Sequence, residues 1–418
     1  MNLLKTSVLN GVAVLIKTAT MFVLNKILAV YVGPAGYAAI GQFQNFIQMI
    51  TTFAGSAINT AVIKYTAEYH EDEIKQRAIW KTAGSIVLFF SIIFSVLILI
   101  FQKQLSIYIF HTIAYQSVFV WFAIFLTFFT FNALFLAILN GKKEVLKLVV
   151  ANILGSLFSL IITSLLAIKY SLYGALVAIS IYQSLAFFVT LFLCYKSDWF
   201  QFRYLFGKIN KEIVTKFAAF ALMALVSAIC VPLSQMFIRG YLSHEYGVTY
   251  AGYWEAMIRL STAYLMLVTT TLGVYYLPRL SELQSLKEIK AEVYLGYKYI
   301  FPLAVLAGLI VYMLRDWIIA LLFTKAFLPM RDLFLWQMIG DSLKIGSWIL
   351  AYLMLSKAMT KLFITTEIIF AFSSILFTYI CTKLFGFEGV TIAHLINYGI
   401  YWLVMSYFVF KAINVKVR

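Results

Sequence analysis

Residues 7–31 read SVLNGVAVLIKTATMFVLNKILAVY, and this stretch decides the fold class. It is long enough to cross a bilayer, because a membrane-spanning helix needs about 20 mostly apolar residues. It nevertheless carries two lysines, Lys17 and Lys26, in a segment that otherwise suits hydrocarbon. This first span therefore indicates an integral membrane protein that keeps basic side chains within the membrane.

The rest of the chain repeats this pattern of apolar segments and polar turns. Of its 418 residues, 63% are hydrophobic and only 12% are charged, and the mean hydropathy is +0.92. Such a composition excludes an ordinary soluble domain. Twelve segments qualify as membrane-spanning helices: 7–31, 37–63, 82–102, 114–140, 146–168, 173–195, 215–240, 250–277, 297–322, 332–355, 360–383 and 388–410. We expect an all-α polytopic membrane protein.

The loops between these segments differ strongly in their basic residues. Most of the 33 Lys and Arg residues fall at the N-terminus, in every second loop and at the C-terminus. Because Lys and Arg concentrate in cytoplasmic loops, this pattern predicts that both termini are cytoplasmic. The net charge of +16 is then mostly a topology signal, and no nucleic-acid partner is expected.

An internal repeat joins the two halves of the chain. Three pairs of segments match at one offset of about 215 residues: Tyr31–Tyr37 with Tyr246–Tyr253, Gln116–Trp121 with Arg331–Trp336, and Tyr173–Ala178 with Glu388–Ala393. The repeat predicts two six-helix bundles, residues 1–205 and 206–418. An even number of spans gives both bundles the same orientation, related by an axis along the membrane normal, with a substrate path between them. This architecture is typical of transporters.

Four basic residues lie well inside the predicted spans: Lys17, Lys26, Arg259 and Lys344. A charge at the centre of a bilayer costs roughly 2.5–3.5 kcal/mol on insertion scales, so it survives mainly where it faces protein or water. Several buried cations with few acids to neutralise them indicate a path for an anion.

The first span gathers its polar side chains on one stripe. Asn10, Lys17, Thr18 and Asn25 fall within roughly 100° of one another on a helix, and Lys17 lies about 15 Å from the end of the span. Lys26 projects to nearly the opposite face. We expect the stripe to face protein or a water-filled cavity rather than lipid.

Acidic residues accompany two of the deep bases. Glu255 stands four residues before Arg259, and Asp341 three residues before Lys344, so each pair can form an ion pair within its own helix. One interpretation is that each pair only neutralises itself; the other is that the bases bind an anionic substrate. Glu255, Asp341 and a third acid, Glu367, are also candidates for coupling transport to an ion.

Three further features leave two interpretations open. His394 is either a packed side chain or a proton-coupling group. Arg239, at the end of the seventh span, either reaches the outer interface or contacts substrate. The segment Gly33–Gly36 between the first two spans is either a simple turn or a hinge.

No motif for catalysis is present. The chain lacks a phosphate-binding GxxxxGK[ST] loop, an HExxH motif and a long loop of the kind that membrane glycan polymerases and ligases carry. Cys194, Cys230 and Cys381 fall in apolar spans without metal-ligand spacing, so neither a metal nor another cofactor is expected. These observations favour a transporter over an enzyme.

Three segments resemble those of the Wzx flippases in the multidrug/oligosaccharidyl-lipid/polysaccharide (MOP) exporter superfamily. They are Lys26–Tyr37, Val62–His70 and Arg331–Lys344. The likeness extends over essentially the whole chain, and within the family it is greatest to flippases of the enterobacterial common antigen, followed by O-antigen flippases.

The resemblance implies two bundles around a cationic cavity that alternate between inward-open and outward-open states (a MATE/MOP-like fold). It implies a substrate, an undecaprenyl-pyrophosphate-linked oligosaccharide, that moves from the cytoplasmic to the periplasmic leaflet of the bacterial inner membrane. It also implies a functional association with a glycan polymerase and a chain-length regulator. By the same resemblance, the substrate contacts would be Lys17, Lys26, Arg239, Arg259 and Lys344. The competing functions are a cation-coupled drug exporter of the same superfamily and a membrane glycan polymerase or ligase.

Overall fold

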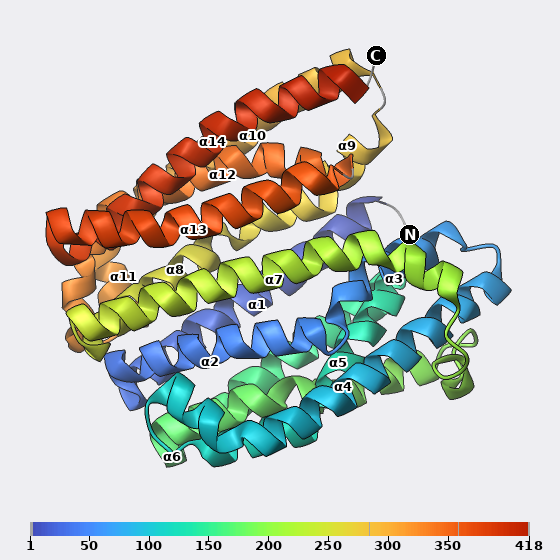
Figure 1. The fold of residues 1–418 in the computed structure, drawn as a ribbon, viewed down its shortest axis with the longest axis horizontal. Helices are drawn as coiled ribbons and strands as arrows, with labels where there is room; N and C mark the ends of the chain where they lie inside the picture. Colours follow the sequence, from blue (N-terminus) through green and yellow to red (C-terminus); the bar gives the residue numbers. More distant parts are fainter. Residues whose placement is uncertain (1–2, 284, 358, 417–418) are drawn as a thin grey trace. The chain divides into compact units, whose positions relative to one another are not determined.

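The computed structural model of the protein describes residues 3–283, 285–357 and 359–416, and every regular element among them is a helix (Figure 1). The α-helices are α1 (Leu3–Tyr31), α2 (Gly33–Phe53), α3 (Asn59–Glu68), α4 (Glu73–Phe110), α5 (Gln116–Gly141), α6 (Val145–Tyr195), α7 (Lys211–Glu245), α8 (Val248–Thr271), α9 (Leu277–Glu282), α10 (Leu286–Met313), α11 (Arg315–Leu322), α12 (Phe334–Ser356), α13 (Thr360–Phe385) and α14 (Gly389–Lys416). Shorter or tighter turns connect them: η1 (Ser56–Ile58), η2 (Phe202–Tyr204), η3 (Leu272–Tyr276), η4 (Lys325–Leu333) and η5 (Gly386–Glu388).

These helices form two compact units. The first comprises Met1–Val32 and Ala39–Pro232, and the second comprises Gly33–Ala38 and Leu233–Arg418. Both units therefore take part of α7, and the second takes the first residues of α2. The boundary between residues 205 and 206 that the sequence repeat predicts stays a prediction.

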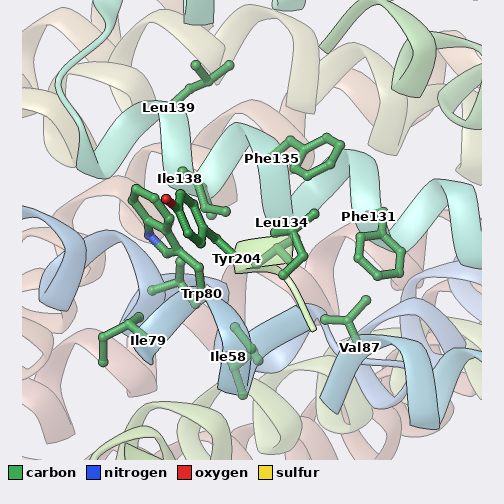
Figure 2. Close-up of a cluster of buried hydrophobic side chains, with 14 of the residues drawn as sticks. Ile58, Ile79, Trp80, Val87, Phe131, Leu134, Phe135, Ile138, Leu139 and Tyr204 are labelled. Carbon is green, nitrogen blue, oxygen red and sulfur yellow. The ribbon is translucent and has the colours of Figure 1, made fainter. Parts of the chain in front are cut away.

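The first unit is a bundle in which α5 packs against α4, α6 and α3, while α1 packs against α6 (Figure 1). Its core gathers large apolar side chains from α4, α5 and the segment after α6. Figure 2 shows Trp80 and Val87 of α4 beside Leu134 and Ile138 of α5, with Tyr204 of η2 closing the cluster. Close van der Waals packing of such side chains holds membrane helices together, since lipid is as apolar as the side chains themselves.

The segment that follows α6 folds back onto α4. Ser85 exchanges hydrogen bonds with the backbone of Gly207, and Thr82 accepts one from the backbone N–H of Asn210. The Arg77 guanidinium lies 4.4 Å from the centre of the Tyr204 ring. This connection is thus an ordered part of the first unit.

In the second unit, α12 packs against α10, α13 and α14, and α13 packs against α14. The start of α2 belongs to the same unit, where the fully buried Tyr37 lies 5.1 Å, centre to centre, from the Phe327 ring. Tyr253, the repeat partner of Tyr37, contacts the same ring at 6.1 Å. Tyr37 and Tyr253, one from each matching segment, therefore both contact the Phe327 ring.

The repeat is visible in backbone geometry as well. Gly33 and Gly247 both have positive φ, +71° and +96°, at the turns before α2 and α8. A Cβ on Gly174 would lie 1.9 Å from the Leu166 carbonyl oxygen, and a Cβ on Gly389 would lie 2.2 Å from the equivalent oxygen of Cys381. In each unit, the matching glycine lets the chain reverse tightly against the end of the preceding span.

The reversal divides two very long helical segments. In α6, Tyr170 and Ser171 leave helical torsion angles, and η5 interrupts the run from Thr360 to Val409. These segments are 51 and 50 residues long, so each has the length of two spans. They correspond to the spans predicted on either side of Tyr173 and Glu388.

Eight described segments are long and apolar enough to cross a membrane, or up to nine if the bent pair Gly33–Phe53 and Ser56–Glu68 is one span. With the two divided segments, this agrees with a polytopic helical membrane protein. The count of twelve spans is consistent with these lengths and stays a prediction.

The glycine pair gives a direct test of the repeat. Gly174→Ala and Gly389→Ala should each lower the thermal stability of the purified protein by a similar amount, because the new methyl group meets a backbone carbonyl and forces a shift costing about 1–3 kcal/mol. The measurement is the melting temperature of the protein in detergent, with unfolding monitored by tryptophan fluorescence.

Gly11→Ala and Gly240→Ala are the matched controls. Both glycines are helical, and an added Cβ would meet nothing within 4 Å. These variants should melt at or above the wild-type temperature because alanine favours a helix. A wild-type melting temperature for Gly174→Ala or Gly389→Ala would contradict the proposed role of the repeat glycines.

Candidate functional site

A buried ion cluster joins α7 and α8 in the second unit. The Glu255 carboxylate accepts a hydrogen bond from Arg239 of α7 at 2.5 Å and another from Arg259 of its own helix at 2.9 Å. The spacing of Glu255 and Arg259 predicted the second contact, which is confirmed. With two arginines around one carboxylate, the cluster keeps an excess of one positive charge.

The two arginines differ in accessibility. The Arg239 side chain is 1% exposed and lies over the Trp254 ring at 5.5 Å, whereas the Arg259 side chain is 15% exposed and lies 5.4 Å from the Tyr37 ring. Arg239 therefore does not reach outward to a membrane interface. Of the two arginines, Arg259 has the more accessible side chain.

A second polar cluster surrounds Asp341 in α12. The carboxylate is fully buried, and it accepts hydrogen bonds from Tyr264 of α8 at 2.9 Å and from Gln337 at 3.1 Å. The imidazole of His394, on α14, lies 3.0 Å from the same carboxylate. Three side chains from three helices thus compensate for one buried carboxylate.

This arrangement corrects the intrahelical pair predicted for α12. Within the described part of the chain, the Asp341 carboxylate lies 3.0 Å from the His394 imidazole, and no ion pair within 4 Å links Asp341 to Lys344. The Lys344 ammonium instead lies between two rings, 5.0 Å from Trp348 and 5.5 Å from Tyr398. Aromatic faces attract a cation and still leave its hydrogen-bond donors available to an anion.

The third acid, Glu367 of α13, is half-buried near this cluster. It lies close enough to Tyr398 and Tyr401 for an electrostatic interaction with both side chains. Glu367 and Asp341 therefore both neighbour Tyr398 of α14.

The remaining candidates lie on α1 in the first unit. Lys17 is exposed, and no described residue forms an ion pair with it. On the same predicted stripe, Asn25 is buried at 3% exposure and Thr18 is half-buried, while the side chain of Asn10 lies outside the described residues. Lys26 is half-buried.

The structure therefore brings together some of the predicted site residues. Arg239, Glu255 and Arg259 form one cluster, while Asp341, Lys344 and Glu367 lie near Tyr398 in another. Lys17 and Lys26 belong to the other compact unit.

Sequence reasoning singled out His394 without connecting it to Asp341, and it missed Tyr264 and Gln337. Tyr264, Gln337 and His394 come from three helices, and only Gln337 stands at helical spacing from Asp341. A histidine on an apolar helix was the one available signal. Gly340 was missed too, although its lack of a side chain lets His394 approach: a Cβ there would lie 2.4 Å from the imidazole.

Comparison with known proteins places these clusters in context. The sequence model of the family described as "Polysaccharide biosynthesis protein" matches residues 3–284. The proteins named Lipid III flippase from Escherichia coli (strain K12) and Shigella flexneri are each 28% identical over 403 residues, covering 96% of this chain and 97% of the relative.

Two solved structures share the fold. An inward-facing multidrug resistance MATE family transporter of the MOP superfamily has a TM-score of 0.74 at 14% identity and covers 95% of both chains. A mutant Vibrio cholerae MATE transporter has a TM-score of 0.70 at 14% identity, covering 97% of both chains. The MATE/MOP-like fold predicted from the sequence is confirmed.

The ion cluster makes a testable prediction about stability. Glu255→Gln should destabilise the protein strongly, by about 3–5 kcal/mol, because it removes the charge that compensates the buried Arg239. Adding Arg239→Met should recover much of that loss, since the double variant no longer buries the uncompensated guanidinium. Melting temperatures of the single and double variants give the comparison.

The exposed ion pair between Lys383 and Glu245, at 3.2 Å, is the control for that comparison. Lys383→Gln should change stability by about 0–1 kcal/mol. A Glu255→Gln variant as stable as this control would show that the buried cluster is not structural.

A second prediction concerns the Asp341 cluster. Gly340→Ala should lower the melting temperature, because the methyl group would displace His394 and the backbone beside Leu395. Gly399→Ala on α14 is its control, since a Cβ there meets Leu343 at an ordinary 3.5 Å. Equal melting temperatures for the two variants would refute the close approach of α12 and α14.

Proposed function

Because the chain belongs to the polysaccharide biosynthesis protein family, we propose that it is a flippase for an undecaprenyl-pyrophosphate-linked oligosaccharide. The likeness of nearly the whole chain to two proteins named Lipid III flippase carries this proposal. The substrate is the lipid-linked repeat unit of a surface polysaccharide such as enterobacterial common antigen or O-antigen. The protein is a transporter, not an enzyme.

The competing functions fit less well. A MATE-type drug exporter shares the fold, but the full-length sequence likeness is to flippases. An exporter of organic cations would need acids accessible to its ligand, whereas the acids here are engaged: Glu255 holds two arginines, and Asp341 is fully buried. A polymerase or ligase would need a catalytic site that the sequence does not indicate.

The physical task of a flippase is to move a charged head group through a medium that rejects charge. The polyprenyl tail stays in lipid throughout, so the barrier is desolvation of the pyrophosphate and sugars, which costs tens of kcal/mol for a bare charge. Basic side chains lower that barrier by replacing lost hydration with charge-assisted hydrogen bonds. Alternating access of the two six-helix halves then exposes the head group to each side in turn.

The basic residues divide this work according to their accessibility. Lys17, Lys26, Arg259 and Lys344 contact the pyrophosphate or glycan. Lys344 suits this role because its ammonium rests on aromatic faces rather than on a carboxylate. Arg239, the fifth candidate, acts by fixing Glu255, which in turn orients Arg259.

Asp341 is the strongest candidate for coupling to protons. Its contact with His394 pairs a carboxylate with the one side chain whose ordinary pKa lies near physiological pH. Glu255 and Glu367 are alternative coupling groups. Downstream consumption of the glycan is the competing source of direction.

The protein is placed as a multi-pass protein of the bacterial inner membrane. Both termini lie in the cytoplasm, in line with the alternation of basic loops. A glycan polymerase and a chain-length regulator are its functional partners, since both act on the flipped product.

Deletion of the gene tests the proposal. Cells lacking the protein should accumulate the lipid-linked oligosaccharide on the cytoplasmic leaflet and lose the corresponding surface polysaccharide, as measured by mass spectrometry of extracted lipids. Complementation with Lys17→Ala should fail despite normal expression, whereas Lys17→Arg should restore part of the transport because it keeps the charge with a different geometry.

Unchanged surface glycan in a deletion strain that has no second flippase would refute the function. Full complementation by Lys17→Ala at native expression would remove only Lys17 from the substrate contacts.

A further inference from the structure

The segment Val62–His70 carries part of the family resemblance, yet the transport path proposed above gives it no role. It forms α3 and the turn that leads into α4. Both α3 and the first residues of α7 lie in the first compact unit. On the predicted topology, this end of the unit faces the cytoplasm, where the lipid-linked substrate is made.

The inner face of α3 is fixed by polar contacts as well as by packing. Thr66 is fully buried, and its hydroxyl accepts a hydrogen bond from the indole of Trp80 at 3.0 Å. Its carbonyl accepts another from the Gln76 amide at 2.7 Å. Gly141 of α5 makes room for this residue, because a Cβ there would lie 2.6 Å from the Thr66 side chain. The helix is thus held rigidly while its other face stays accessible.

The accessible face presents stacked tyrosines and lysines. The rings of Tyr65 and Tyr69 lie 6.2 Å apart at an interplanar angle of 20°. Lys216 of α7 donates a hydrogen bond to the Tyr69 hydroxyl at 2.8 Å, and its ammonium lies 5.8 Å from the Tyr65 ring. Lys64 lies 5.2 Å from Tyr65 and 5.1 Å from Phe220. We call Lys64, Tyr65, Tyr69 and Lys216 the α3–α7 surface.

The lysines of this surface keep their positive charge available. Both Lys64 and Lys216 are exposed, and within the described part of the chain neither forms an ion pair with a carboxylate. The Lys216 ammonium donates its hydrogen bond to a hydroxyl group and not to a carboxylate. Glu68 influences Lys216 electrostatically, while Asp72 is engaged with Lys75 at 3.0 Å.

The second unit differs at the position equivalent to Lys64. At the repeat offset of about 215 residues, Arg279 takes the place of Lys64. Its guanidinium lies 3.6 Å from Glu282 and 3.8 Å from Glu292, so its charge is compensated within the unit. If these basic residues only set the orientation of the chain in the membrane, we would expect no difference between Lys64 and Arg279 in their acidic partners. The contrast points to a use for the first unit's lysines outside the protein.

We propose that the α3–α7 surface binds the pyrophosphate and first sugar of the lipid-linked substrate before transport, as a docking site at the cytoplasmic face. Ammonium groups form charge-assisted hydrogen bonds with phosphate oxygens. The two half-buried tyrosines add ring edges and hydroxyl groups, which can contact a sugar ring. This inference rests on the proposed flippase function, and it adds a binding site apart from the basic residues within the membrane.

Direct binding measurements test the docking site. The protein is reconstituted in nanodiscs of phosphatidylcholine and titrated with undecaprenyl pyrophosphate, with and without one attached sugar, using native mass spectrometry. The double variant Lys64→Gln/Lys216→Gln should weaken binding of both probes by at least about tenfold, because two charge-assisted contacts are lost. Tyr65→Leu/Tyr69→Leu should remove the gain in affinity that the sugar provides.

The double variant Lys196→Gln/Lys208→Gln is the matched control. Both lysines are exposed on the same predicted side and lie outside the proposed site. This variant should bind as wild type does. Wild-type affinity in Lys64→Gln/Lys216→Gln would overturn the proposal. So would an equal loss of binding for phosphatidylglycerol, titrated in the same way, since that result describes a general anion-attracting surface.

The outcome separates this inference from the function on which it rests. If deletion traps lipid-linked glycan but the variants bind normally, the docking site is wrong and the flippase function stands. If the wild-type protein binds neither probe and deletion leaves the surface glycan intact, the function itself is wrong.

Discussion

The cost of holding a charge inside the hydrocarbon of a bilayer is the constraint on which the rest of this structure depends. The second unit meets it in two ways. Glu255 lies between two arginines, and Asp341 is fully buried among hydrogen-bond donors from three helices. Lys344 has aromatic faces instead of a carboxylate partner. The acids already accept hydrogen bonds from protein side chains, whereas the Lys344 ammonium has no carboxylate partner within 4 Å among the described residues. This arrangement favours an anionic ligand.

The internal repeat explains why one sequence pattern can build both units. Gly174 and Gly389 permit the same close approach to a carbonyl oxygen eight residues earlier, and Gly33 and Gly247 open matching turns. The backbone is thus repeated while the side chains have diverged. Candidate basic residues lie on α1 in the first unit and in the two polar clusters in the second. The two halves therefore share a fold but differ in where they hold positive charge.

Sequence reasoning could predict those features that depend on local spacing. Apolar length predicted a polytopic helical protein, and the i,i+4 spacing of Glu255 and Arg259 predicted a contact found at 2.9 Å. The pair expected between Asp341 and Lys344 was wrong, because spacing along one helix does not reveal a competing partner on another helix. His394 lies 53 residues from Asp341 in sequence, and only the packing of α12 against α14 brings them together. The hydrogen bond between Arg239 and Glu255 also joins two helices, α7 and α8, so helical spacing could not predict it.

The basic side chains of this protein are proposed to recognise the negative charge of the lipid head group that it moves. The most direct test is the flipping rate, in proteoliposomes, of two lipids with the same polyprenyl tail and sugar, one linked by pyrophosphate and the other by an uncharged spacer. The account predicts that the pyrophosphate lipid crosses at least about tenfold faster, a difference of 1.4 kcal/mol in the barrier. Equal rates for the two lipids, both above the rate in protein-free vesicles, would contradict it.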